Sequence, residues 1–151
     1  TALSAILRKA EAHCEARKID QQAILAFRLF PDMLSFTRQV LIACDFAKGA
    51  AARLAGEAVP SYTDDEKSFA DLQARIAKTL AFMDGLGKER YEGSATRPVT
   101  VKIAGQERTM SGEDYFNSFV LPNFYFHSTV AYAILRHNGV ELGKNDFVGR
   151  T

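Results

Sequence analysis

Apolar side chains recur at helical spacing through four long stretches of this sequence, and this pattern limits the possible fold more than any other feature. The stretches are residues 1–17, 32–54, 63–84 and 111–139. The apolar stripe of the first consists of Leu3, Leu7, Ala10 and Cys14. A stripe with this spacing predicts a helix with one buried face. Because four such helices must cover one another's apolar faces, the sequence predicts an all-α fold, an antiparallel four-helix bundle.

Proline, glycine and capping residues indicate where these helices begin and end. Asp20 is expected to cap a short helix, which Pro31 ends because proline lacks an N–H group. Residues 63–66 read TDDE, the pattern of a capping box, so the third long helix is expected to begin there. Gly85 and Gly87 follow its apolar stripe and are expected to end it.

One segment has a period of two, which is the period of a strand. In RPVTVKIAGQERTM, residues 97–110, three apolar side chains alternate with polar ones: Val99, Val101 and Ile103. Gly105 lies where a turn would join this strand to a returning one. The sequence therefore predicts a small β-hairpin inserted before the last long helix.

The last helical region, residues 111–139, contains a proline near its middle. Pro122 predicts either a kink or a fresh helix start, because its ring cannot continue the hydrogen-bond ladder. The residues after Gly139 are expected to be irregular, with Leu142 and Phe147 folded back on the helices.

Composition and charge exclude several classes of protein. The 151 residues are 47% hydrophobic and 25% charged with a formal net charge of +1, which predicts a single globular domain over residues 1–151. Basic residues alternate with acidic ones, so no nucleic-acid partner is expected. No apolar run reaches the ~20 residues of a membrane span. Cys14 and Cys44 match no zinc or redox spacing, which favours reduced thiols in a cytoplasmic protein.

Three polar side chains interrupt the apolar stripes. In LPNFYFHSTVAYAILRHNG, Asn123 and His127 are four positions apart, and Gln39 lies in the same way within the stripe of the second long helix. The stripe around the first two consists of Phe116, Val120, Val130, Ala131 and Ile134. Burying such a group without a partner costs roughly 2–7 kcal/mol, so these groups are expected to meet partners or water.

Two interpretations of this polar cluster are open. It is either a hydrogen-bonded scaffold that determines how two helices pair, which is the commoner role of buried polar side chains, or a small-molecule pocket. In the pocket, Gln39, Asn123 and His127 would bind the ligand, with Phe46 and Phe124 as walls. Asp45 and Lys48 are expected to form a solvent-exposed ion pair on the second long helix.

Two segments carry a family resemblance: LPNFYFHSTVAYAILRHNGVELGKNDFVG and DMLSFTRQVLIACDFAKGAAARLAG. They resemble an uncharacterised bacterial family, a domain of unknown function, within the DinB/YfiT-like superfamily. The resemblance covers nearly the whole chain and implies a DinB-like four-helix bundle, with a further short stretch before Thr1.

The same resemblance implies a position for a metal. Many members of the superfamily hold zinc or nickel with three histidines, one from the second helix and two from the last. In this sequence those positions hold Gln39, Asn123 and His127. Because amides are poor ligands for zinc, no cofactor is expected; the alternative is a degenerate site in which these three residues hold a divalent metal, zinc or nickel.

Three functions are consistent with these features. The first is a metal-free domain that binds a small-molecule ligand. The second is a metal-dependent hydrolase or thiol transferase, in which His127 would be the main ligand and the metal would lower the pKa of a bound water or thiol. The third is a structural homodimer formed through exposed helix faces. Fold analogy does not choose among them, because function belongs to the site.

Overall fold

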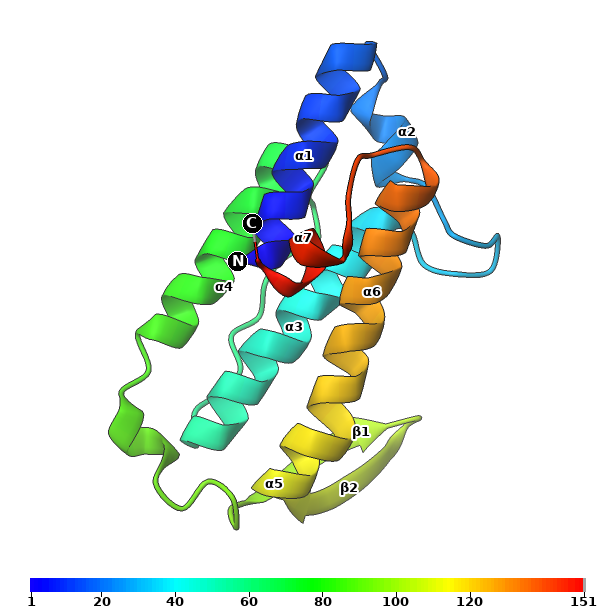
Figure 1. Ribbon diagram of the computed structural model, residues 1–151. Helices are drawn as coiled ribbons and strands as arrows, with labels where there is room; N and C mark the ends of the chain where they lie inside the picture. Colours follow the sequence, from blue (N-terminus) through cyan, green and yellow to red (C-terminus); the bar gives the residue numbers. More distant parts are fainter. Residues whose placement is uncertain (151) are drawn as a thin grey trace.

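The computed structural model describes residues 1–150, and four long helices dominate it (Figure 1). They are α1 (Ala2–Arg17), α3 (Phe36–Ala55), α4 (Phe69–Asp84) and α6 (Leu121–His137). Helix α3 packs against both α6 and α4, and α1 covers α4 and part of α6. The predicted, mostly helical fold with a hairpin before the last long helix is therefore confirmed. Within residues 1–150 no helix is both long and apolar enough to cross a membrane.

Shorter elements connect these helices. They are α2 (Gln21–Leu25), η1 (Lys88–Tyr91), α5 (Gly112–Asp114), the π-helical segment η2 (Tyr115–Val120) and α7 (Lys144–Val148). The tail is thus helical in part, although the sequence predicted it to be irregular. Its apolar residues do fold back as expected, since Leu142 is buried and the ring of Phe147 packs edge-on against that of Tyr132.

The hairpin forms as predicted. Strand β1 (Pro98–Ile103) pairs antiparallel with β2 (Gln106–Ser111), and Ile103 lies opposite Gln106 at the turn. The two turn residues, Ala104 and Gly105, have φ values of 49° and 83°, the conformation in which a two-residue turn matches the strand twist. The inward side chains of β1, Val99 and Val101, form a small second core with Tyr115 and Val120.

A π-helical turn corrects the predicted stripe of the last helical region. The stripe placed Phe116 on the buried side, yet Phe116 is 39% exposed, whereas its neighbour Tyr115 is 1% exposed. Segment η2 has a wider turn than an α-helix, so the residue that faces the core moves by one position. Pro122 is the second residue of α6. It marks the change from the π-helical segment to an α-helix, and the helix continues through it.

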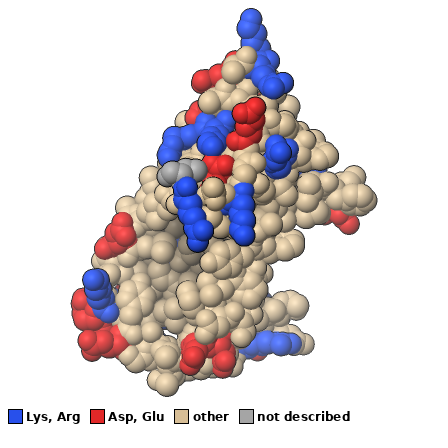
Figure 2. Space-filling model, in the orientation of Figure 1, with Lys and Arg blue, Asp and Glu red and all other residues tan. Residues whose placement is uncertain are grey.

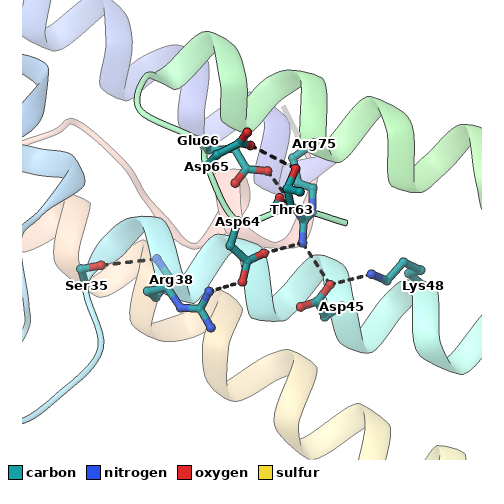
Figure 3. A network of polar contacts seen from close by, with 9 residues as sticks. All are labelled: Ser35, Arg38, Asp45, Lys48, Thr63, Asp64, Asp65, Glu66 and Arg75. Atoms are coloured by element: carbon teal, nitrogen blue, oxygen red, sulfur yellow. Dashed lines mark hydrogen bonds and ion pairs between the residues drawn. The ribbon is translucent and has the colours of Figure 1, made fainter. Parts of the chain in front are cut away.

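The start of α4 also differs from the prediction. The helix begins after Ser68, whose Oγ accepts a hydrogen bond from the backbone N–H of Asp71 at 3.1 Å. Residues 63–66 therefore do not form a capping box. They lie in the loop before α4, where their oxygens surround the side chain of Arg75 (Figure 3).

Candidate functional site

Helices α3 and α6 bring two of the three predicted polar residues together. The Nδ1 atom of His127 lies 2.7 Å from Oε1 of Gln39, which is fully buried. The Nε2 amide of Gln39 donates to the carbonyl of Leu34 at 3.2 Å, so the amide oxygen is the atom that faces the imidazole. His127 Nδ1 is therefore the donor in this pair. The imidazole also stacks on the ring of Phe46, with 5.9 Å between centroids.

The third predicted residue does not join this pair. The Nδ2 atom of Asn123 donates to the carbonyl of Phe119 at 2.7 Å, four residues earlier in the π-helical segment η2. Asparagine often bonds to nearby backbone in this way instead of reaching across to another element. The predicted three-residue cluster is thus a Gln39–His127 pair with Asn123 beside it on the same helix.

Burial lowers the pKa of His127 below its ordinary value of 6.5. The unfolded chain therefore binds this proton more readily, so the stability tied to the neutral imidazole is complete above pH 6.5 and is lost as the pH falls through the lowered folded-state pKa. We expect the free energy of unfolding to fall over this interval, and to fall less in His127→Gln. Urea denaturation at a series of pH values measures both.

Asn123→Ala is the control for this pH series, because it alters the neighbouring position and keeps the imidazole. It should retain the pH dependence of the unaltered protein. A His127→Gln variant with the same pH slope as the unaltered protein would show that this imidazole has no part in the dependence.

The residues at the predicted metal position do not fit a divalent metal. One imidazole and two amides are a poor donor set for zinc or nickel, and each amide already has a protein partner. The carboxylate of Asp45, on the same helix as Gln39, pairs with Lys48 at 2.9 Å and with Arg75 at 3.1 Å. Among residues 1–150, no three His, Cys, Asp or Glu side chains converge on a metal-sized space.

A separate apolar cavity of about 300 Å³ lies among α1, α3, α4, α6 and α7. Its walls include Leu3, Ile6, Ala43, Ile76, Leu80 and Phe124. Figure 2 shows that the surface between α4 and α6 is uncharged and is hollowed below the N-terminal end of α1. Of the residues expected to form a pocket, only Phe124 lines this cavity; Gln39, Asn123 and His127 do not.

Two buried hydroxyl groups line the cavity without an oxygen or nitrogen partner, and only the thiol of Cys44, a weak hydrogen-bond partner, lies near that of Thr79. Thr79 on α4 and Ser128 on α6 are 4% and 7% exposed, and neither Oγ atom makes a hydrogen bond to oxygen or nitrogen within residues 1–150. A buried polar group left in this state costs about 1–3 kcal/mol. Neither residue was predicted from the sequence, although each is three positions from an apolar stripe residue: Thr79 follows Ile76, and Ser128 precedes Ala131.

A thiol also lines the cavity. Burial raises the pKa of Cys44 to about 11, although the nearby Thr79 hydroxyl and Arg75 act in the opposite direction. The group is therefore a neutral thiol near pH 7, and thiols react as nucleophiles chiefly in the thiolate form. Cys44 serves as a weakly polar part of the wall.

The buried guanidinium of Arg75 lies one turn before Thr79 on α4 (Figure 3). It donates to the Thr63 carbonyl at 2.8 Å, to Glu66 at 2.9 Å, and to Asp45 and Asp64 at 3.1 Å each. These contacts hold the loop of residues 57–68 against α3 and α4.

A second group of charges surrounds this guanidinium. Arg38 pairs with Asp64, and its hydrogen bond lowers the pKa of that carboxyl. The ammonium groups of Lys48 and Lys78 lie 4.0 and 4.1 Å from the centroid of the Tyr62 ring. Lys48 was expected in solvent but is buried, because the loop and its tyrosine cover it. Its predicted ion pair with Asp45 does form.

The helical topology with its inserted hairpin is that of a DinB-like domain. Residues 1–148 match the family described as a domain of unknown function, DUF1993, and the chain belongs to this family. It is similar to a DinB family member protein from Shewanella denitrificans, known from a crystal structure, with 41% identity and a TM-score of 0.91 over 98% of this chain and 84% of that one. No curated protein matches the sequence. The predicted family resemblance is confirmed.

Proposed function

We propose that this protein binds a small, largely apolar molecule in the cavity among α1, α3, α4 and α6. The observation that carries the proposal is the cavity of about 300 Å³ with almost wholly apolar walls. An apolar cavity of about 150 Å³ can hold benzene, so this one has room for a ligand of roughly ten non-hydrogen atoms. The proposal includes a DinB-like antiparallel four-helix bundle, an architecture that commonly builds ligand sites between facing helices.

The pocket expected at Gln39, Asn123 and His127 has less support as the ligand site. Gln39 on α3 and His127 on α6 form a hydrogen bond with each other, and Asn123 bonds to the carbonyl of Phe119 in η2. In this proposal the pair aligns the two helices, and the ligand occupies the separate apolar cavity. A cytoplasmic location is also proposed, supported by two buried free thiols, Cys14 and Cys44.

Titration with p-xylene tests the proposal, followed by amide chemical shifts in NMR spectra. Residues that line the cavity, such as Ile76 and Phe124, should shift in a saturable manner. Ala47→Met should abolish the effect, because its longer side chain enters the same space. Ala81→Met is the matched control, since Ala81 is exposed on α4. Shifts scattered over the surface, or equal binding by Ala47→Met, would contradict the proposal.

A metal-dependent hydrolase or thiol transferase centred on His127 is less well supported, because the donor set does not fit a divalent metal. We expect purified protein to contain less than about 0.1 zinc or nickel per chain, since structural sites keep their metal and poor donor sets lose it. Elemental analysis measures this content. About one metal per chain, removed by His127→Ala, would instead establish the metal site.

A homodimer is a second candidate, favoured by adjacent exposed aromatic residues on α6. Tyr125 and Phe126 are both more than half exposed, which is unusual for large aromatic side chains. Sedimentation analysis at micromolar concentration tests this candidate. A dimer that Phe126→Glu dissociates would support it, and a strictly monomeric mass would exclude it.

A further inference from the structure

The polar groups of the cavity restrict the chemistry of its ligand. Within residues 1–150, no Lys, Arg, Asp, Glu or His side chain lines it. Four residues with hydroxyl groups line it: Thr1, Thr79, Tyr125 and Ser128. Of these, Thr79 on α4 and Ser128 on α6 are more than nine-tenths buried and have no oxygen or nitrogen partner. Buried hydroxyls almost always have a hydrogen-bond partner, and here the protein supplies no oxygen or nitrogen. A ligand in the cavity would be positioned to supply the missing hydrogen-bond partner.

We propose that the cavity binds a neutral molecule whose apolar body carries one hydroxyl group, held by Thr79 and Ser128. This inference rests on the proposed function, since it names the class of ligand for the same cavity. A ligand hydroxyl both donates and accepts, so it can pair with either protein hydroxyl in whichever sense that group is oriented. A carboxylate or ammonium is excluded, because the apolar walls offer no counter-charge to offset its desolvation.

Two compounds of nearly the same shape separate the hydroxyl from the apolar body. In p-cresol a hydroxyl replaces one methyl group of p-xylene, and a phenol with a pKa near 10 is neutral at pH 7. The dissociation constants of both compounds are measured by NMR titration for the unaltered protein, Thr79→Val, Ser128→Ala and the double variant. A third compound, 4-methylbenzoate, provides the charged head group.

The quantity that decides is the ratio of p-cresol affinity to p-xylene affinity in each protein. Changes in stability or cavity volume act on both compounds and cancel in this ratio. We expect it to fall on the order of tenfold from the unaltered protein to the double variant, since about one or two hydrogen bonds are lost. We expect 4-methylbenzoate to bind the unaltered protein more weakly than p-cresol.

Each other outcome has a distinct meaning. If both neutral compounds bind in the cavity and the ratio is unchanged in the double variant, the hydroxyl assignment is wrong and the proposed function stands. If 4-methylbenzoate binds tighter than p-cresol, the requirement for a neutral ligand is wrong. If neither neutral compound binds, both the ligand class and the proposed function are overturned. Circular dichroism verifies that each variant is folded.

Discussion

Arg75→Met should lower the free energy of unfolding by about 3–5 kcal/mol, the largest loss expected for a polar substitution in this chain. The side chain is buried and donates to three carboxylates and one carbonyl. Its removal strands Glu66, whose side chain is 9% exposed and whose Oε2 atom already lacks a partner. A buried carboxylate without its counter-charge is strongly destabilising. Urea denaturation measures the loss.

Arg38→Met is the matched control, because Arg38 also pairs with Asp64 but is 42% exposed. An exposed pair of this kind contributes about 0–1 kcal/mol. The double variant Arg75→Met/Glu66→Gln should recover part of the stability lost in Arg75→Met, because it removes the stranded charge. Equal losses in the two arginine variants, with no recovery in the double variant, would show that the Arg75 network is not a buried one in solution.

Thr79→Val and Ser128→Ala should each raise the free energy of unfolding, by about 1–3 kcal/mol. Loss of a hydroxyl usually destabilises a protein, since it breaks a hydrogen bond. Here neither hydroxyl has an oxygen or nitrogen partner in the protein, so each substitution removes a buried group that lacks a strong hydrogen bond, and Thr79→Val loses only a weak contact with the Cys44 thiol. The two sites lie on different helices, α4 and α6, and their effects should add when no ligand is present. Urea denaturation measures each variant and the pair.

Thr37→Val is the control for the predicted rise in the free energy of unfolding. Thr37 is also partly buried, but its hydroxyl donates to the Leu25 carbonyl at 3.0 Å, so its loss should destabilise the protein by about 1 kcal/mol. Destabilisation by Thr79→Val and Ser128→Ala to the same extent would mean that both hydroxyls have partners, such as bound water. That result would remove the basis for a ligand hydroxyl in the cavity.

The cavity hydroxyls and the Arg75 network differ in how much of each could be predicted from the sequence. Thr79 and Ser128 lie beside predicted apolar stripes and not within them, so the spacing did not identify them as buried. The absence of strong partners could not be predicted either, because it depends on which side chains three other helices present. The role of Arg75 was not predicted for a different reason. Residues 63–66 have the pattern of a capping box, but their charge-assisted hydrogen bonds to the buried guanidinium are stronger than this local preference.

The Gln39–His127 pair shows the same division. Their positions within two stripes predicted that they would lie inside, and the hydrogen bond of 2.7 Å between them agrees. The spacing also predicted that Asn123 would join them, and this was wrong. A position on a helix face determines the direction of the Cα–Cβ bond, whereas the partner of an amide depends on which acceptor is nearest, here the Phe119 carbonyl.

The sequence by itself determined the four long helices, the hairpin and the family, because apolar periodicity, turn residues and local motifs act over a few neighbouring positions. Tertiary structure alone decided the burial of Lys48 and the cavity lined by the buried hydroxyls of Thr79 and Ser128. These features arise where segments distant in sequence pack together. The volume and the charges at such a contact depend on all the elements that form it.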